Sequence, residues 1–157
     1  MRRLATIVVV LVGLAACGGG GGSDGAPLTG AQLVARVNAE CQKLQQASSD
    51  LTNAQDPTAH GAVVARYLHA ASGQLRSRLQ AISALVPPSS LASQVSRFVA
   101  LLNRYADGLD ALANRAKSGD TYAALLDRST SQVNSLNSLS DQADTIASKL
   151  GFTACET

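Results

Sequence analysis

From Leu28 onward, apolar residues recur at steps of three and four along the chain, in four runs separated by turn-forming residues. This spacing places the apolar side chains of each run on one face of a helix, and no segment alternates as a half-buried strand does. The runs span residues 30–51, 57–86, 90–118 and 121–150. Their similar lengths and short joints predict an all-α fold, specifically an up-down four-helix bundle.

Capping residues predict where these helices begin and end. Three groups of residues predict helix starts: a capping box at Thr29 and Gln32, an N-cap followed by Pro at Asp56-Pro57, and an N-cap at Asp120. Helix breakers predict three ends: Val86 before Pro87-Pro88, Gly119, and a Schellman ending at Gly151 with Phe152 folded back on the helix.

The N-terminus has the features of an export signal. Arg2 and Arg3 precede an apolar run over residues 4–16, which is too short to span a membrane because a span needs roughly 20 residues. Leu14-Ala15-Ala16-Cys17 resembles a bacterial lipobox, so residues 1–16 are predicted to be a lipoprotein signal peptide and Cys17 the lipidated residue. The alternative is an ordinary secretory signal, with Cys17 present by chance.

Residues 17–27 are predicted to be a lipidated cysteine followed by a flexible glycine-rich linker, because this segment has almost no apolar side chains to bury. The domain over residues 28–157 would then be held at the extracytoplasmic face of the cell membrane. The chain has 13 Lys and Arg against 11 Asp and Glu, and loss of Arg2 and Arg3 balances the two signs. A neutral domain with few aromatic residues lacks the basic surface that nucleic-acid binding requires.

The remaining cysteines, Cys41 and Cys155, form an even number in an oxidising compartment and are predicted to be joined by a disulfide. The alternative is a buried free thiol at Cys41 and an exposed one at Cys155. The disulfide excludes a bundle with level helix ends, because Cys41 would lie about 20–25 Å below the exit of the last helix. Either the first helix extends higher than the last, or the last helix ends before Leu150.

Several of these segments occur together in a known group of proteins. They are Leu28-Thr29-Gly30-Ala31-Gln32-Leu33 leading to Ala39-Glu40-Cys41, then Leu85-Val86-Pro87-Pro88, Gly119-Asp120, and Leu150-Gly151-Phe152 leading to Cys155. In this order they resemble small exported helical lipoproteins of GC-rich bacteria, over nearly the whole mature chain. The resemblance implies a helical fold, a lipid anchor and a paired cysteine. It implies no activity and no catalytic residue.

Residues able to hold a metal or haem are few. The only glutamates are Glu40 and Glu156, which do not form the Glu plus Glu-x-x-His set of di-iron bundles. His60 and His69 are nine positions apart and fall on opposite faces of the predicted second helix, so we expect His69 to be solvated. We therefore expect no metal and no cofactor.

Carboxylate pairs at Asp107 and Asp110, and at Asp141 and Asp144, fall opposite the apolar stripes of their helices. General acid–base catalysis needs a desolvated pair with separated pKa values. We expect these pairs to be solvated instead, with weak calcium binding as the remaining role. No enzyme activity is predicted.

Polar residues interrupt the apolar stripes midway along the bundle. Ser129 and Gln132 lie in the stripe of the predicted fourth helix, with Tyr105 at a similar height and Tyr67 nearby. One interpretation is a buried hydrogen-bond network that sets helix register. The other is a small polar cavity, where bundles commonly hold ligands.

The first functional hypothesis is a non-enzymatic interaction or scaffold module that binds other envelope proteins. The alternative is a carrier or sensor that holds a small or lipidic ligand inside the bundle. Four apolar residues just off the stripes distinguish these hypotheses: if exposed together they favour a partner surface, and if they line a space between helices they favour a carrier. They are Val34, Val63, Val99 and Leu126.

Overall fold

The computed structural model of the chain describes residues 26–53 and 60–156, with side chains from residue 26 to residue 50 and from residue 60 onward. Its regular structure within these ranges is entirely helical, which confirms the predicted all-α class. The elements are α1 (Gly30–Asn53), α2 (Ala62–Ser83), α3 (Ser89–Ala113), α4 (Tyr122–Arg128), α5 (Thr130–Leu150) and the short 3₁₀ helix η1 (Thr153–Cys155).

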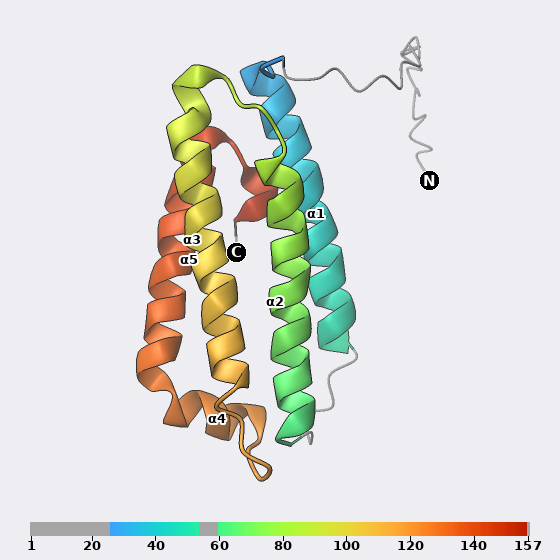
Figure 1. Cartoon of the computed structure of the whole chain (residues 1–157), viewed down its shortest axis with the longest axis vertical. Helices are drawn as coiled ribbons and strands as arrows, with labels where there is room; N and C mark the ends of the chain where they lie inside the picture. The colour runs from blue at the N-terminus through green and yellow to red at the C-terminus, as the bar shows by residue number, and fades with distance from the viewer. Residues whose placement is uncertain (1–25, 54–59, 157) are drawn as a thin grey trace, which may run out of the picture.

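The four long helices lie side by side along the long axis of the molecule (Figure 1). In that view α1 and α3 run downward and α2 and α5 run upward, while α4 lies across the lower end. Helix α2 packs against α1 and α3, and α3 packs against α5. The η1 segment contacts both α1 and α5, so the C-terminal residues fill the space between the first and last long helices.

One predicted helix start and one predicted helix end are confirmed by their hydrogen bonds. At the start of α1, the Thr29 N–H donates to Gln32 Oε1 at 2.9 Å, and the Gln32 N–H donates to Thr29 Oγ1 at 3.2 Å, as in a capping box. At the end of α5, Gly151 has φ 77°, and the Phe152 N–H donates to the Ala147 carbonyl at 2.9 Å. This is a Schellman ending, which requires a residue that tolerates positive φ.

The described part of α2 begins later than the prediction, at Ala62, because the chain bends at Gly61. Gly61 has φ 50°, and its N–H donates to the Asp120 carbonyl at 2.9 Å. A Cβ at this position would lie 2.7 Å from Ser118 Cα, so the α3–α4 loop packs directly on the glycine. The predicted start at Asp56-Pro57 lies outside the described residues.

Helices α2 and α3 also end earlier than predicted. Helix α2 ends at Ser83 rather than Val86, and the Val86 carbonyl instead accepts the Leu28 N–H at 2.9 Å, which attaches the start of α1 to the α2–α3 loop. Helix α3 ends at Ala113 rather than near Gly119. A loop then replaces the last predicted turn.

The predicted cap at Asp120 is wrong. Thr121 is the N-cap of α4, and its hydroxyl accepts the Ala124 N–H at 3.2 Å. The Asp120 carboxylate instead accepts the Lys117 N–H at 2.7 Å and pairs with Arg128 at 2.5 Å, so it closes the α3–α4 loop.

The predicted fourth helix is broken at Ser129 into α4 and α5. Ser129 has φ −110° and ψ 23°, outside helical values, and its carbonyl accepts the Gln132 N–H that starts α5. The bend lets α4 cross the lower end, where Leu125 is fully buried. In this arrangement α4 contributes Leu125 to the buried cluster at that end of the molecule.

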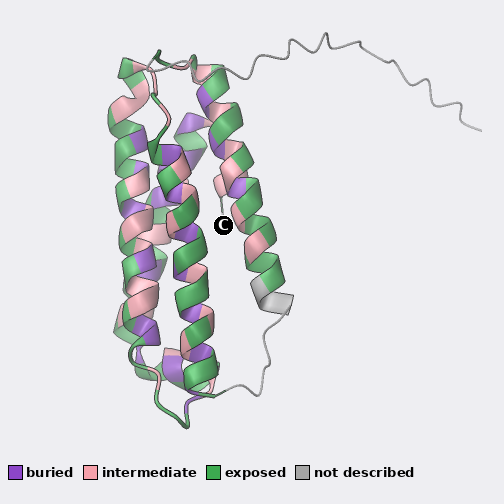
Figure 2. Cartoon of the chain, turned by 45° about the vertical axis from the view of Figure 1, so that its right-hand side comes forward, coloured by how far each residue is buried: buried purple, intermediate pink, exposed green. Residues whose placement is uncertain are grey.

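Buried residues, purple in Figure 2, occur along all the long helices, and the apolar ones form two clusters. The upper core consists of Leu33, Val37, Cys41, Leu75, Leu79, Ile82, Val95, Phe98, Leu101, Ala106, Ala143, Ile146, Ala147, Leu150 and Phe152. The lower core consists of Val64, Leu68, Leu112, Ala113, Leu125 and Leu136. All four long helices supply the upper core, whereas none of the described α1 side chains belongs to the lower core.

Candidate ligand-binding cleft

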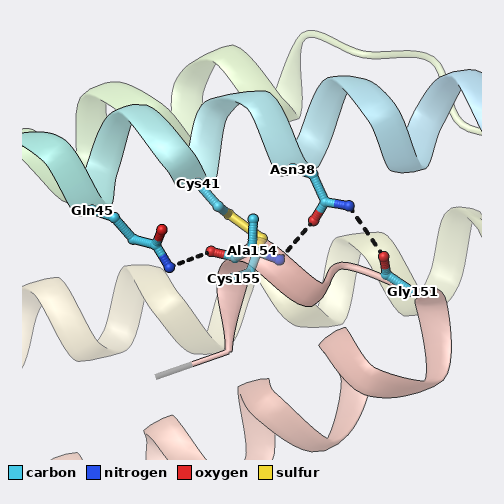
Figure 3. The surroundings of a disulfide bond; sticks show 6 residues. All are labelled: Asn38, Cys41, Gln45, Gly151, Ala154 and Cys155. Atoms are coloured by element: carbon cyan, nitrogen blue, oxygen red, sulfur yellow. Dashed lines mark hydrogen bonds between the residues drawn. A yellow bond between two sulfur atoms is a disulfide. The ribbon is translucent and has the colours of Figure 1, made fainter. Parts of the chain in front are cut away.

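The predicted disulfide between Cys41 and Cys155 is present and joins η1 to the middle of α1 (Figure 3). Side chains of α1 reinforce the junction on both sides. Asn38 Nδ2 donates to the Gly151 carbonyl at 3.2 Å, and Asn38 Oδ1 accepts the Ala154 N–H at 3.0 Å. Gln45 Nε2 donates to the Ala154 carbonyl at 2.9 Å. The segment after α5 is therefore held along α1 by the disulfide and by hydrogen bonds between its main chain and the side chains of α1.

These contacts show how the disulfide forms even though α5 continues to Leu150. The bond from Asn38 places Gly151 level with the third turn of α1, so α1 begins higher than α5 ends. Cys41 then lies only about 5 Å further along α1 at 1.5 Å per residue, which η1 spans easily. The structure has the first of the two expected geometries, in which the first helix extends higher than the last.

Below η1 lies a cleft of about 310 Å³, which we name the α1 cleft. Helix α1 forms one side, α2 and α3 form the other, and the C-terminal residues 154–156 close its upper end. Figure 2 shows α1 at the right, diverging from the other helices toward its lower end. The cleft begins at Cys41 and continues along α1 below it, where no described α1 side chain belongs to the lower core.

The lining of the α1 cleft is mostly apolar, and it includes every tyrosine of the chain. The tyrosines are Tyr67 on α2, Tyr105 on α3 and Tyr122 at the start of α4. The aliphatic part of the lining comes from α1, α2 and α3 and comprises Leu44, Leu68, Ala71, Leu75, Leu102 and Leu109.

The tyrosines lie close enough to affect one another. The rings of Tyr67 and Tyr122 meet edge to face, with centroids 6.3 Å apart and an interplanar angle of 86°. Burial raises the pKa of Tyr105. Burial also raises the pKa of Tyr122, with a further contribution from the nearby phenols of Tyr67 and Tyr105. At neutral pH these hydroxyls are therefore uncharged and can both donate and accept hydrogen bonds.

Charge is nearly absent from the lining. Among the described residues that line the cleft, Glu156 is the one with a charged side chain, and it accepts a hydrogen bond from the Ser148 hydroxyl at 2.7 Å. The other polar side chains are neutral: Gln45, Ser48, Gln74 and Ser140. Such a lining suits an uncharged apolar molecule that makes a few hydrogen bonds.

Two of the four residues predicted to form a cavity line this cleft, and two do not. Tyr67 and Tyr105 are on its wall. Ser129 is buried at the α4–α5 bend instead, and Gln132 Nε2 donates to the Gly108 carbonyl at 2.8 Å across α3 and α5. The predicted grouping is wrong for Ser129 and Gln132, because Ser129 lies at the α4–α5 bend and Gln132 binds the main chain of α3.

Sequence reasoning missed Tyr122 as a cleft residue, although a signal was available. In an antiparallel arrangement, the start of the second helix, the end of the third and the start of the fourth meet at one end. Tyr67 and Tyr122 belong to that end, and Tyr105 lies in the half of the third helix nearest to it. Their shared position in the topology predicts proximity better than the polar interruptions at Ser129 and Gln132 did.

Of the side chains expected to be solvated, His69, Asp107 and Asp110 form an ion-pair network with Arg76 across α2 and α3. On α5, Asp141 is exposed and Asp144 is partly exposed. His69 Nδ1 lies 2.7 Å from Asp110 Oδ1, and Arg76 bonds both Asp110 at 2.5 Å and Asp107 at 2.8 Å. His69 and Asp107 are exposed as expected, although both are paired, whereas Asp110 is partly buried between His69 and Arg76. In residues 26–53 and 60–156 no group of three or more His, Cys, Asp or Glu is placed to hold a metal.

The four apolar residues just off the stripes are neither exposed together nor grouped around a space between helices. Val34 and Val99 pack against the upper core, and Leu126 packs against the lower core. Val63 is exposed, and none of the four lines the α1 cleft.

Comparison with protein-family models, with curated proteins and with solved structures finds no match for this chain. None of the helices in the described ranges combines the length and apolarity needed to cross a membrane. The predicted lipidation site, Cys17, and the signal peptide lie outside those ranges.

Proposed function

We propose that this protein is a binding protein that carries a small, mainly apolar ligand in the α1 cleft, with no catalytic role. It would be anchored through lipid on Cys17 at the extracytoplasmic face of the cell membrane, and its domain would be an up-down four-helix bundle. The observation that carries the proposal is the cleft between α1 and the rest of the fold, at which all three tyrosines gather.

The size of the cleft supports this function. Ligand sites in proteins commonly measure about 300–1,000 Å³, and an engineered cavity of about 150 Å³ binds benzene. At about 310 Å³ the α1 cleft has roughly twice that volume. A ligand the size of two fused rings would fill it.

The surface gives less support to the interaction or scaffold hypothesis. The exposed large apolar side chains among the described residues are Val63, Val86 and Tyr122. Val86 belongs to the α2–α3 loop, at the opposite end from Val63 and Tyr122, and Tyr122 belongs to the cleft. A docking surface needs a contiguous apolar patch, and these residues do not form one.

A matched pair of substitutions on α2 tests the function. Ala71 lines the cleft, whereas its neighbour Ala70 is exposed and does not. Ala71→Trp should fill the cleft, and Ala70→Trp should leave it open. We would purify the lipidated protein and both variants in lipid nanodiscs and identify bound small molecules by native mass spectrometry.

We expect a bound molecule in the wild type and in Ala70→Trp, and its loss from Ala71→Trp. A molecule retained equally by Ala71→Trp would contradict the cleft as the site. Absence of any bound molecule from all three proteins would contradict the carrier function. The same spectra report the anchor, because lipid on Cys17 adds mass that a Cys17→Ala protein lacks.

A further inference from the structure

We infer that the α1 cleft selects neutral aromatic molecules with a hydroxyl group, of about two fused rings, and discriminates against carboxylates such as fatty acids. This inference rests on the proposed function and specifies its ligand class. Three properties of the lining lead to it: the sign of its charge, its aromatic content and the hydroxyl groups of its tyrosines.

The charge of the lining disfavours an anionic ligand. No Lys, Arg or His is among the described residues that line the cleft, and its charged member, Glu156, is an acid. A ligand carboxylate would leave water without a cationic partner, which is costly in a mostly apolar site. It would also be repelled by Glu156 at the upper end. A neutral ligand meets neither penalty.

The aromatic residues favour a ring over an alkyl chain. Aromatic pairs gain energy beyond their buried area when they stack with an offset or meet edge to face, at centroid separations of 4.5–7 Å. The pair of Tyr67 and Tyr122 already has this geometry at 6.3 Å, and Tyr105 is near enough to influence the Tyr122 phenol. A flat ligand can therefore contact more than one ring, whereas an alkyl chain gains only the buried area.

The tyrosine hydroxyls favour a ligand that carries its own hydroxyl. Tyr105 is half-buried on the wall of the cleft, and burial raises the pKa of its phenol, so the hydroxyl stays neutral in a mostly apolar site. A purely hydrocarbon ligand would displace water from this hydroxyl and leave it without a partner, which weakens binding. A ligand hydroxyl restores the bond, since a neutral phenol both donates and accepts.

Three probes separate these terms. 2-Naphthol is neutral at pH 7, 2-naphthoate has the same rings with a carboxylate, and 1-decanol has the hydroxyl without the rings. We would titrate each into the lipidated protein in nanodiscs by isothermal titration calorimetry, with empty nanodiscs as the blank. We expect 2-naphthol to bind at least tenfold more tightly than 2-naphthoate and at least threefold more tightly than 1-decanol.

Two variants locate the preference in the cleft. Tyr105→Phe removes one hydroxyl and should weaken 2-naphthol binding three- to tenfold, while Gln132→Leu lies outside the cleft and should leave it unchanged. Glu156→Gln should raise the affinity for 2-naphthoate about two- to threefold at low salt and leave 2-naphthol unaffected. The midpoint of thermal unfolding of each variant checks that the fold is retained.

The outcomes distinguish the inference from the function beneath it. If 2-naphthoate or 1-decanol binds as tightly as 2-naphthol, the ligand class is wrong while the cleft still binds a ligand. If affinity for 2-naphthol falls equally in Tyr105→Phe and Gln132→Leu, the phenol does not contact the ligand and the inference is overturned. If no probe binds, both the inference and the carrier function fail.

Discussion

The upper and lower halves of this protein share α2, α3 and α5 and differ in what α1 contributes. In the upper half, α1 supplies Leu33, Val37 and Cys41 to the core and is joined to the C-terminal segment by a disulfide. In the lower half, α2, α3, α4 and α5 form a core without any described α1 side chain. The cleft begins where α1 leaves the upper core, so this space arises because one helix diverges from the others.

The apolar stripe of α3 shows the same difference within one helix. Val95 and Phe98 are buried in the upper core, whereas Leu102, Tyr105 and Leu109 continue the stripe but are only half-buried. Those three line the cleft. A regular apolar stripe therefore indicates which face of a helix is turned inward, but it does not show whether a partner helix covers that face along its full length.

Removal of the disulfide should have the largest effect on this comparison, because it releases the upper half of α1 from the C-terminal segment. The bond spans a sequence separation of 114, and the chain-entropy model assigns such a loop about 4–5 kcal/mol. We expect a Cys41→Ala/Cys155→Ala protein to lose that much free energy of unfolding in urea titration. Reduced wild-type protein is the control and should match it. A loss below about 1 kcal/mol would mean that the bonds from Asn38 and Gln45 suffice.

Truncation of two adjacent leucines on α3 should show that the upper core is packed more tightly than the cleft wall. Leu101 is 5% exposed in the upper core, and Leu102 faces the cleft half-buried. Leu101→Ala should cost about 2–5 kcal/mol, as buried leucines do, and Leu102→Ala about 1 kcal/mol or less. Chemical denaturation of both variants measures the difference. Equal losses would show that the cleft wall is packed as tightly as the core.

Two glycines of the α2 region should respond with opposite signs to the same substitution. Gly61 has φ 50°, with the Ser118 backbone 2.7 Å from the position of an added Cβ, so Gly61→Ala should cost about 2 kcal/mol or more. Gly73 lies mid-helix with nothing within 4 Å, so Gly73→Ala should stabilise by about 0.5–1 kcal/mol. Thermal unfolding of the two variants tests this, and a stabilised Gly61→Ala would show that the loop contact is unimportant.

The smallest expected effect is on the pH dependence of stability, to which Asp120 in the lower half contributes. Hydrogen bonds from Arg128 and from the Lys117 backbone lower the pKa of Asp120 from 3.8 to about 2. A lowered pKa means that the stabilisation is present above about pH 4 and is lost as the pH falls through about 2. Asp120→Asn should therefore lower the midpoint of thermal unfolding by a few degrees at pH 7, and the difference from wild type should shrink from pH 4 to pH 2. A difference that is constant with pH would exclude the ion pair as its source.

Local signals in the sequence predicted the features that depend on a few neighbouring residues. The capping box at Thr29 and Gln32 and the Schellman ending at Gly151 need only their own turns, so the sequence contains all the required information. The pairing of Cys41 with Cys155 followed from the count of cysteines that remain after Cys17. These features place α1, the end of α5 and the upper limit of the cleft.

The features that were not predicted depend on distant contacts. The local sequence predicts that Asp120 caps a helix. Its carboxylate instead binds Arg128 and the Lys117 amide. The break at Ser129 accompanies the burial of Leu125 among residues of α2, α3 and α5, and no local pattern specifies those contacts. The cleft was anticipated in part, through Tyr67 and Tyr105, because polar interruptions of a stripe do not tell which neighbouring helix they face.

The gathering of the tyrosines has a consequence for spectroscopy. The chain has no tryptophan, and its three tyrosines all line the α1 cleft. Its ultraviolet emission therefore comes almost wholly from that one place, with no background from elsewhere in the fold. Quenching or a shift of this emission is an intrinsic report of cleft occupancy, and it needs no label.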